Sequence, residues 1–190
     1  MEVVVGTPST LAQDTIHRMA VYRHRIFVEM LGWQLPSGQS GIELDQFDCL
    51  DTMYMIARQG DDVVGVARLL PTHRPYLLKE VFPHLMGGLP LPNSPDVWEL
   101  SRFTAIDLSG KPPEGCTRQV SSPIAVGLLT MVLQVAAAHG VQRLITVSPL
   151  GIERLLRRSG FLAHRAAPPV TIAGQPTYAC WIEVPQQRSD

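Results

Sequence analysis

Charged residues are scarce in this chain. They make up 17% of its 190 residues, against roughly 25% in an average soluble domain. The 16 Lys and Arg and 17 Asp and Glu give a formal net charge of -1, which argues against the uniformly basic surface that non-specific nucleic-acid binding requires. Only Lys79 and Lys111 are lysines, and residues 111–190 hold eight basic but four acidic side chains. Each charge in an unexpected place is therefore informative.

Cysteines are few and long apolar runs are absent. Cys49, Cys116 and Cys180 are odd in number, far apart and without a CxxC pair, so neither a disulfide framework nor a zinc site is expected. The longest apolar stretch, 124–138, falls short of the ~20 residues of a membrane span, and the first residues lack the pattern of a signal peptide. We expect a single cytoplasmic domain, 1–190, with no bound metal and no membrane segment.

Hydrophobic periodicity and turn residues predict the elements of a mixed sheet. Strands are expected at 1–5, 54–58, 63–70, 97–106, 144–147 and 177–184. Helices are expected at 10–31, with Ser9 or Thr10 as N-cap, and at 77–82, 123–139 and 151–159. The helix at 123–139 follows a Ser-Ser-Pro cap and is apolar nearly all round, which predicts burial. This order indicates an α/β (α+β) fold with one mostly antiparallel sheet and helices on both faces.

Two arginines occupy positions that should face the core. Arg23 lies between Ala20 and Phe27 on the apolar stripe of the first helix, and alternation places Arg68 on one face with Val64 and Val66. A guanidinium buried without a partner costs several kcal/mol, so each of these needs a carboxylate from the protein or from a ligand. For Arg23 alone, a side chain that snorkels or ties down the next loop is the competing explanation.

Acids that could pair with these arginines occur in two segments. The run from Glu43 to Asp48 holds three acids in six residues, although a solvated acidic loop is the commoner explanation for such a run taken alone. In the strand at 97–106, strict alternation separates Glu99 from Arg102, unless a β-bulge brings them together. The inward candidates form a zwitterionic and aromatic pocket with Arg23, Arg68, Glu99, Arg102, Asp45 and Asp48, lined by Phe27, Trp33, Phe82 and Phe103.

Several catalytic motifs are missing. The chain has no glycine-rich dinucleotide or P-loop motif, no GxSxG and no HExxH, which disfavours oxidoreductases, P-loop NTPases, α/β-hydrolases and zincins. Its own motifs, in order, are Arg23-x₃-Phe27-x₃-Leu31-Gly32-Trp33, Glu43-x-Asp45-x-Phe47-Asp48, Arg68-Leu69-Leu70-Pro71-Thr72, Phe82-Pro83 and Trp98-Glu99-Leu100-Ser101-Arg102-Phe103.

In these motifs the chain resembles the LuxI-type acyl-homoserine-lactone synthases. The resemblance covers nearly the whole chain and implies a fold like that of GCN5-related N-acyltransferases. It also implies acyl transfer from an acyl carrier protein to the amine of S-adenosylmethionine, followed by lactone closure that releases methylthioadenosine and yields a quorum-sensing signal. S-adenosylmethionine is then a substrate, and no cofactor is expected.

The resemblance carries roles onto matching residues. Phe27 and Trp33 are expected to enclose the adenosyl-sulfonium end, and Phe82 and Phe103 are also expected among the residues that bind S-adenosylmethionine. Asp45 and Asp48 are expected to order their loop and hold the amine. Arg23 or Arg102 is expected to receive the carboxylate, with Arg68 also in the catalytic set. Glu99 is the candidate base, because a free amine is needed as the nucleophile.

Other residues are candidates for binding the acyl donor. Ser101, Thr146 and Ser148 are candidates for the acyl-chain pocket, although simple strand packing explains the last two equally well. Arg154, Arg157 and Arg158 share one helix face and are candidates for carrier-protein docking, with an ordinary solvated face as the alternative. The stretch 117–123 lacks the glycines of a coenzyme A loop, which favours a carrier-protein donor. Overall likeness suggests a medium acyl chain of about eight carbons.

Two other functions remain open from the sequence. One is an acyl-CoA-dependent N-acyltransferase of the same fold that acts on another amine. The other is a non-catalytic ligand-binding domain that retains the pocket, which the intact set of matched polar residues disfavours.

Overall fold

The computed structural model describes residues 1–33, 41–108, 123–150 and 152–186. In these residues one sheet has the strand order β1-β2-β3-β4-β5-β8-β6, with β7 paired to β8. All strand pairs are antiparallel except β4 with β5, which confirms the mixed, mostly antiparallel sheet. The strands are β1 (Glu2–Gly6), β2 (Met53–Gln59), β3 (Asp62–Pro71), β4 (Val97–Thr104), β5 (Arg143–Pro149), β6 (Ala163–Arg165), β7 (Val170–Ile172) and β8 (Gln175–Glu183).

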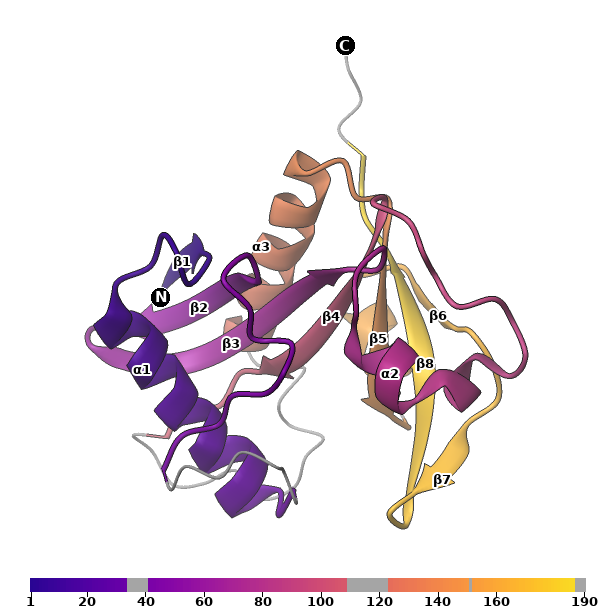
Figure 1. Cartoon of the computed structure of the whole chain (residues 1–190), viewed down its shortest axis with the longest axis horizontal. Coiled ribbons are helices and arrows are strands. Elements are labelled where there is room, and N and C mark those ends of the chain that lie inside the picture. The colour runs from indigo at the N-terminus through magenta and orange to yellow at the C-terminus, as the bar shows by residue number, and fades with distance from the viewer. Residues whose placement is uncertain (34–40, 109–122, 151, 187–190) are drawn as a thin grey trace.

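Helices cover both faces of the sheet (Figure 1). On β2, Tyr54 and Ile56 pack in a cluster with α1, while Met55 and Ala57 pack in a cluster with α3. Alternate residues of a strand point to opposite faces, so α1 and α3 lie on opposite sides. The helical segments are α1 (Gln13–Arg23), the π-helix η1 (His24–Met30), α2 (Leu77–Val81), the 3₁₀ turn η2 (Pro83–Met86), α3 (Pro123–Ala138) and α4 (Ile152–Arg158).

The first helix differs from the expected one at both ends. It begins at Gln13 with Ala12 in the N-cap position, because Thr10 instead closes a turn in which its Oγ1 accepts the Thr7 N–H at 2.8 Å. After Arg23 the α-helix becomes a π-helix. The wider π turn is a local feature often found at functional sites, and here it carries Phe27.

Two β-bulges change which residues share a face. The register of β2 against β3 shifts at Ala57/Arg58, and Val64 packs toward α3 whereas Val66 packs toward α1. The expectation that Val64 and Val66 share a face is therefore wrong. A second shift between β3 and β4 gives β4 one extra residue, at Arg102, whose φ of 51° is left-handed.

Helix α3 is buried on one side only, which corrects the expectation of full burial. Leu128, Leu129 and Val132 are buried, while Thr130 and Gln134 are exposed. Gly65 on β3 permits the close approach, since a Cβ there would lie 3.1 Å from the Thr104 carbonyl oxygen and 3.2 Å from Leu128. The expected Ser-Ser cap before this helix lies outside the described residues. No helix in the described ranges has the length and hydropathy to cross a membrane.

Strands β4 and β5 pair over a short distance and then separate. Their parallel register covers only Val97–Glu99 against Arg143–Ile145, although β4 continues to Thr104 and β5 to Pro149. Ser101 and Arg102 thus lie on β4 beyond the point of separation, and Thr146 and Ser148 lie beyond it on β5. Figure 1 shows the two strands diverging below their paired ends.

Candidate active site

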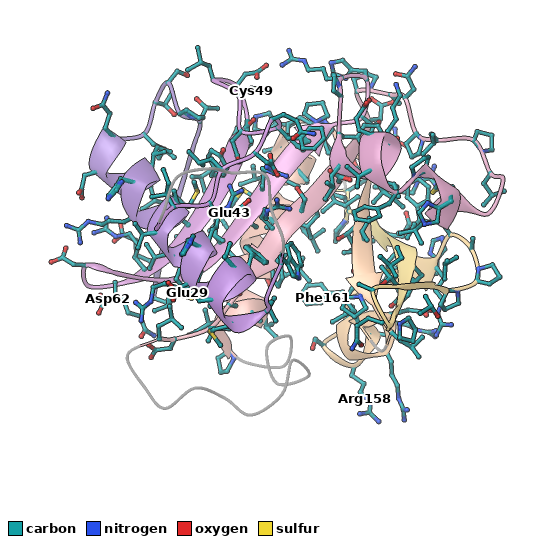
Figure 2. The ribbon with its side chains drawn as sticks, turned by 60° about the horizontal axis from the view of Figure 1, so that its bottom comes forward. Glu29, Glu43, Cys49, Asp62, Arg158 and Phe161 are labelled. Carbon is teal, nitrogen blue, oxygen red and sulfur yellow. The ribbon has the colours of Figure 1, made fainter. Side chains whose placement is uncertain are left out.

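Six charged side chains converge between α1 and the sheet. Arg23 comes from the end of α1, Arg68 from β3 and Arg102 from β4, and the segment after residue 41 supplies three acids. Figure 2 shows one of them, Glu43, over the strands beside the first helix. Arg23, Arg68 and Glu43 have no exposed surface, so the inward positions predicted for both arginines are confirmed.

Arg23 is held by two acids at once. Its Nε donates to Glu43 Oε2 at 2.5 Å, and its Nη1 and Nη2 donate to the two oxygens of Asp48 at 2.8 and 3.0 Å. Burial alone would lower the pKa of Arg23, but Asp48 and Glu43 raise it above its ordinary value. Arg23 is therefore a permanent cation whose three nitrogens are all used within the protein.

Arg68 and Arg102 extend the network to the strands. Arg68 Nη1 donates to Asp45 at 2.6 Å and to Asp48 at 3.0 Å. Arg102 donates from Nη2 to Asp45 at 2.7 Å and to Glu43 at 3.0 Å. The bulge at Arg102 turns its side chain to this face. Three cations and three anions cancel, so the buried group is neutral as a whole.

The two aspartates differ in how much hydrogen-bonding capacity remains. Asp48 accepts five bonds, from Arg23 twice, Arg68, the Tyr54 hydroxyl at 2.6 Å and the Asp45 N–H at 2.7 Å. Burial raises the pKa of Asp48, but Arg23 and Arg68 lower it by a larger amount, so the net pKa is below the usual range of an aspartate. Asp45 accepts three bonds and its side chain is 11% exposed. A carboxylate has about four acceptor sites, so Asp48 is saturated and Asp45 is not.

An aromatic pair closes one side of the cluster. Phe27 and Trp33 stack with centroids 4.7 Å apart, and the Arg102 guanidinium lies 5.5 Å from each ring. The other two expected aromatics do not join them. Phe82 packs in the cluster beneath α2, and Phe103 packs beneath α3 on the opposite face, because the bulge reverses the alternation expected for β4.

Glu99 is buried but stands apart from the aspartates. Its two oxygens accept the backbone N–H groups of Leu77 and Leu78 at 2.9 and 2.6 Å, so it satisfies the first turn of α2. Burial raises the pKa of Glu99 to about 7, although these N–H groups and two arginines oppose the shift. A β-bulge does occur at Arg102, which was one of the two alternatives left open, but Glu99 and Arg102 bind different partners.

The other predicted residues lie in three places. Ser101 Oγ accepts a hydrogen bond from Arg68 Nε at 3.0 Å, which places it at the charged cluster. Thr146 and Ser148 are buried on β5 opposite Cys180 and Tyr178 of β8. Arg154, Arg157 and Arg158 line a groove of about 550 Å³ with Glu153 and Arg165, about α4 and the outer edge of the sheet. In the described ranges no group of three His, Cys, Asp or Glu side chains is placed to hold a metal ion.

The autoinducer synthase family pattern matches residues 8–190. The chain belongs to this family. An acyl-homoserine-lactone synthase of Acinetobacter nosocomialis is 48% identical over 185 residues, which cover 97% of this chain and 100% of the relative. The relatives confirm that the chain is an acyltransferase of the acyl-homoserine-lactone synthase type, as its sequence predicts.

Solved structures of autoinducer synthases share this fold. TofI, in a ternary complex with an inhibitor and methylthioadenosine (MTA), is 41% identical, with a TM-score of 0.82 over 97% of this chain and 92% of TofI. BjaI, described as CoA-dependent and solved with S-adenosylmethionine (SAM) and isopentyl-CoA, is 26% identical, with a TM-score of 0.82 over 97% and 84%. A putative N-acetyltransferase from Lactobacillus plantarum has a TM-score of 0.58 at 17% identity over 97% and 98%, which supports the acyltransferase-like fold alone.

Sequence reasoning left two residues of this autoinducer synthase out of the predicted pocket, although it named Glu43 among the acids that could pair with the arginines. Glu43 stood out as one of three acids, but its contact with both Arg23 and Arg102 depends on how α1 meets β4. Tyr54 is buried on β2 and donates to Asp48. Its alternation with inward residues predicts burial but gives no indication of an acidic partner.

Replacing Glu43 with Gln should destabilise the protein strongly. The change leaves Arg23 and Arg102 buried with one anion fewer, and loss of one partner from a buried ion pair costs about 3–5 kcal/mol. Urea unfolding measures this loss. Glu29→Gln is the matched control, because the Glu29 side chain is 59% exposed and should change stability by no more than ~0.5 kcal/mol. A loss below about 1 kcal/mol for Glu43→Gln would contradict the central place given to this residue.

Proposed function

We propose that this chain joins an acyl group to S-adenosylmethionine and then closes the product to a lactone. The amine nitrogen attacks the carbonyl carbon of a carrier-protein thioester, the carbon–sulfur bond breaks and the carrier thiol leaves. A carboxylate oxygen then attacks the carbon beside the sulfonium, and neutral methylthioadenosine departs. The observation that carries this proposal is the Arg–carboxylate cluster beside stacked Phe27 and Trp33, which suits a ligand with an ammonium, a carboxylate and a cationic aromatic end.

The donors and acceptors that remain free in the cluster support a partner for each charged group of the substrate. Asp45 retains an acceptor site for the ammonium, whereas Asp48 orders the loop as a saturated hub. Arg23 is fully engaged, so Arg102 is the better partner for the carboxylate. Arg68 Nη2 is buried without a hydrogen-bond partner among the described residues, and it gives the site one further donor for a substrate oxygen. S-adenosylmethionine is consumed as a substrate, and the reaction needs no cofactor.

The aromatic pair suits the adenosyl-sulfonium end. Trp33 is 41% exposed while Phe27 is buried, so part of the indole is accessible to an adenine ring. Arg102 already lies over both rings, which marks them as a place where a cation is stabilised by the ring quadrupole. Phe82 and Phe103 lie in other clusters and contribute to the surrounding packing rather than to this contact.

Glu99 is proposed to take a proton from the ammonium, directly or through water. With a pKa of about 7, a large share of Glu99 is ionised at neutral pH, and this value suits a general base. Both of its oxygens already accept an N–H, but each carboxylate oxygen has a second lone pair. The proton can therefore reach Glu99 without disrupting α2.

The acyl chain is proposed to enter where β4 and β5 separate. Ser101 lies on β4 and Thr146 and Ser148 lie on β5, all beyond the last paired residues. Their hydroxyl groups suit a substituted acyl chain, and the apolar side chains around them limit its length, for which about eight carbons is proposed.

An acyl carrier protein is the proposed donor. Carrier proteins present an acidic surface, and the groove on α4 gathers four arginines with one glutamate. The stretch 117–122, whose lack of glycines favours the same donor, lies outside the described residues. Acyl-CoA is the alternative donor, since BjaI is CoA-dependent. An acyl-CoA-dependent transferase for another amine is the second candidate function.

A donor comparison tests the proposed reaction. The protein is mixed with S-adenosylmethionine and either octanoyl-carrier protein or octanoyl-CoA, and methylthioadenosine and lactone are measured by mass spectrometry. The carrier donor should give both products in equal amounts, with kcat/KM at least about tenfold above that of the CoA donor. Amide formation from octanoyl-CoA when other amines replace S-adenosylmethionine, without methylthioadenosine, would favour the second candidate. No turnover with either donor would favour a binding domain.

Glu99→Gln should remove one ionisation from the pH profile. Because the carboxylate is the active form, kcat/KM of the wild type should rise with pH through about 7 and level off above it. The variant should lose this limb, and its kcat should fall by about a hundredfold or more. Thermal unfolding checks that α2 remains in place. Nearly full turnover at saturating substrate would show that Glu99 is not the base.

Charge reversal at Arg157 and Arg158 should weaken carrier docking. We expect KM for the acyl-carrier donor to rise by about tenfold or more, with a smaller salt dependence, while KM for S-adenosylmethionine stays constant. Arg18→Glu with Arg58→Glu makes the same change in net charge in a different groove and should leave the donor KM near that of the wild type. An unchanged donor KM in the Arg157/Arg158 variant would exclude this surface.

A further inference from the structure

The arginine groove contains its own counter-charge. Arg154, Arg157 and Arg158 come from α4 and Arg165 from β6, and Glu153 is the acid among them. Figure 2 shows Arg158 extending from the edge of the molecule. An acid within a surface proposed for an acidic partner opposes that partner, so its presence needs an explanation.

Glu153 engages two of the four arginines. Its Oε2 accepts a hydrogen bond from Arg165 Nε at 2.8 Å, and its Oε1 lies 3.9 Å from Arg157 Nη1. The Glu153 side chain is 16% exposed while that of Arg157 is 67% exposed. Arg154 and Arg158 have no ion pair with any residue that the structure describes. The groove thus has two arginines held by Glu153 and two open to a partner.

A buried tyrosine fixes Glu153 in place. The Tyr178 hydroxyl on β8 accepts the Glu153 N–H at 2.8 Å, and the Arg165 guanidinium lies over the Tyr178 ring at 5.1 Å. Tyr178 has no exposed surface. The backbone of Glu153 is therefore held by the folded core, and its carboxylate is paired with Arg165 before any partner arrives.

An acidic partner must compete with Glu153 for Arg157 and Arg165. The arginine partners are exposed, at 67% for Arg157 and 44% for Arg165, and ion pairs with exposed partners contribute little stability and are screened by salt. An anionic group that enters the groove can therefore replace Glu153 at these two arginines. The partner must then displace an internal anion before it reaches these arginines. Its affinity is lower than four free arginines would give.

A groove that binds the carrier protein with moderate affinity suits a reaction in which the carrier's docking surface does not change. A carrier protein that has lost its acyl group keeps the acidic surface by which it docked. If docking were too tight, the spent carrier would occupy the groove and release would limit turnover. We propose that Glu153 is a counter-charge that weakens docking of the carrier protein and speeds release of the spent carrier. This inference rests on the proposed carrier-protein donor.

Glu153→Gln tests the inference in the full-length protein. The variant should lower KM for octanoyl-carrier protein by about threefold to tenfold and lower the inhibition constant of spent carrier by the same factor. The salt dependence of both should steepen, and KM for S-adenosylmethionine should not change. Glu153→Asp retains the charge and should stay near the wild type. Glu2→Gln, on β1 at the other edge of the sheet, controls for net charge and should have no effect.

Two results would overturn the proposal. An unchanged donor KM in Glu153→Gln would show that Glu153 does not compete with the partner, and a higher donor KM would show that it only supports the shape of the groove. The Arg157/Arg158 reversal separates this failure from that of the proposed function. If that reversal raises the donor KM while Glu153→Gln does not lower it, only the role of Glu153 is lost. If neither affects the donor KM, the docking surface itself is wrong.

Discussion

The buried network of three arginines and three carboxylates determines how α1, the acidic segment and strands β3 and β4 are assembled. No member can be buried alone, because an uncompensated charge in the interior costs several kcal/mol. Arg23, Arg68 and Arg102 come from α1, β3 and β4, and each shares an acid with another arginine. The helix, the acidic segment and both strands must therefore reach their places together, and the network specifies their arrangement more than it adds stability.

The same network explains an otherwise unfavourable backbone. A left-handed φ at a residue with a long side chain is uncommon and strained, yet Arg102 has a φ of 51°. That conformation is part of the bulge that turns Arg102 toward Glu43 and Asp45. Without the bulge, alternation would send its guanidinium into the apolar cluster beneath α3. The ion pairs offset the strain, and the bulge keeps the charged cluster on the α1 face.

The sequence predicted the features that depend on the local pattern of apolar and charged residues. Arg23 was found because a charge interrupts an apolar stripe with helical period, and the sheet class followed from the order of the elements. The bulge in β4 was one of two alternatives raised for Glu99 and Arg102, but nothing in the sequence indicated the bulge between β2 and β3, since register depends on the partner strand. Val64 and Phe103 were therefore predicted on the wrong faces of the sheet. Strands β6 and β7 are three residues each, too short to show a period, and form only by pairing with β8.

The buried cluster and the arginines of α4 act on their proposed substrates over different distances. Within the buried cluster the charges cancel over a few ångströms, so its field falls off quickly and acts on a ligand already in contact. The arginines of α4 are exposed and only partly balanced by Glu153, so their field extends into solvent to about a Debye length. Such a field attracts an acidic protein before contact. On the proposed function, the small zwitterion is selected by contact geometry and the carrier by long-range attraction. Because the internal site is neutral, it does not disturb the field that guides the carrier.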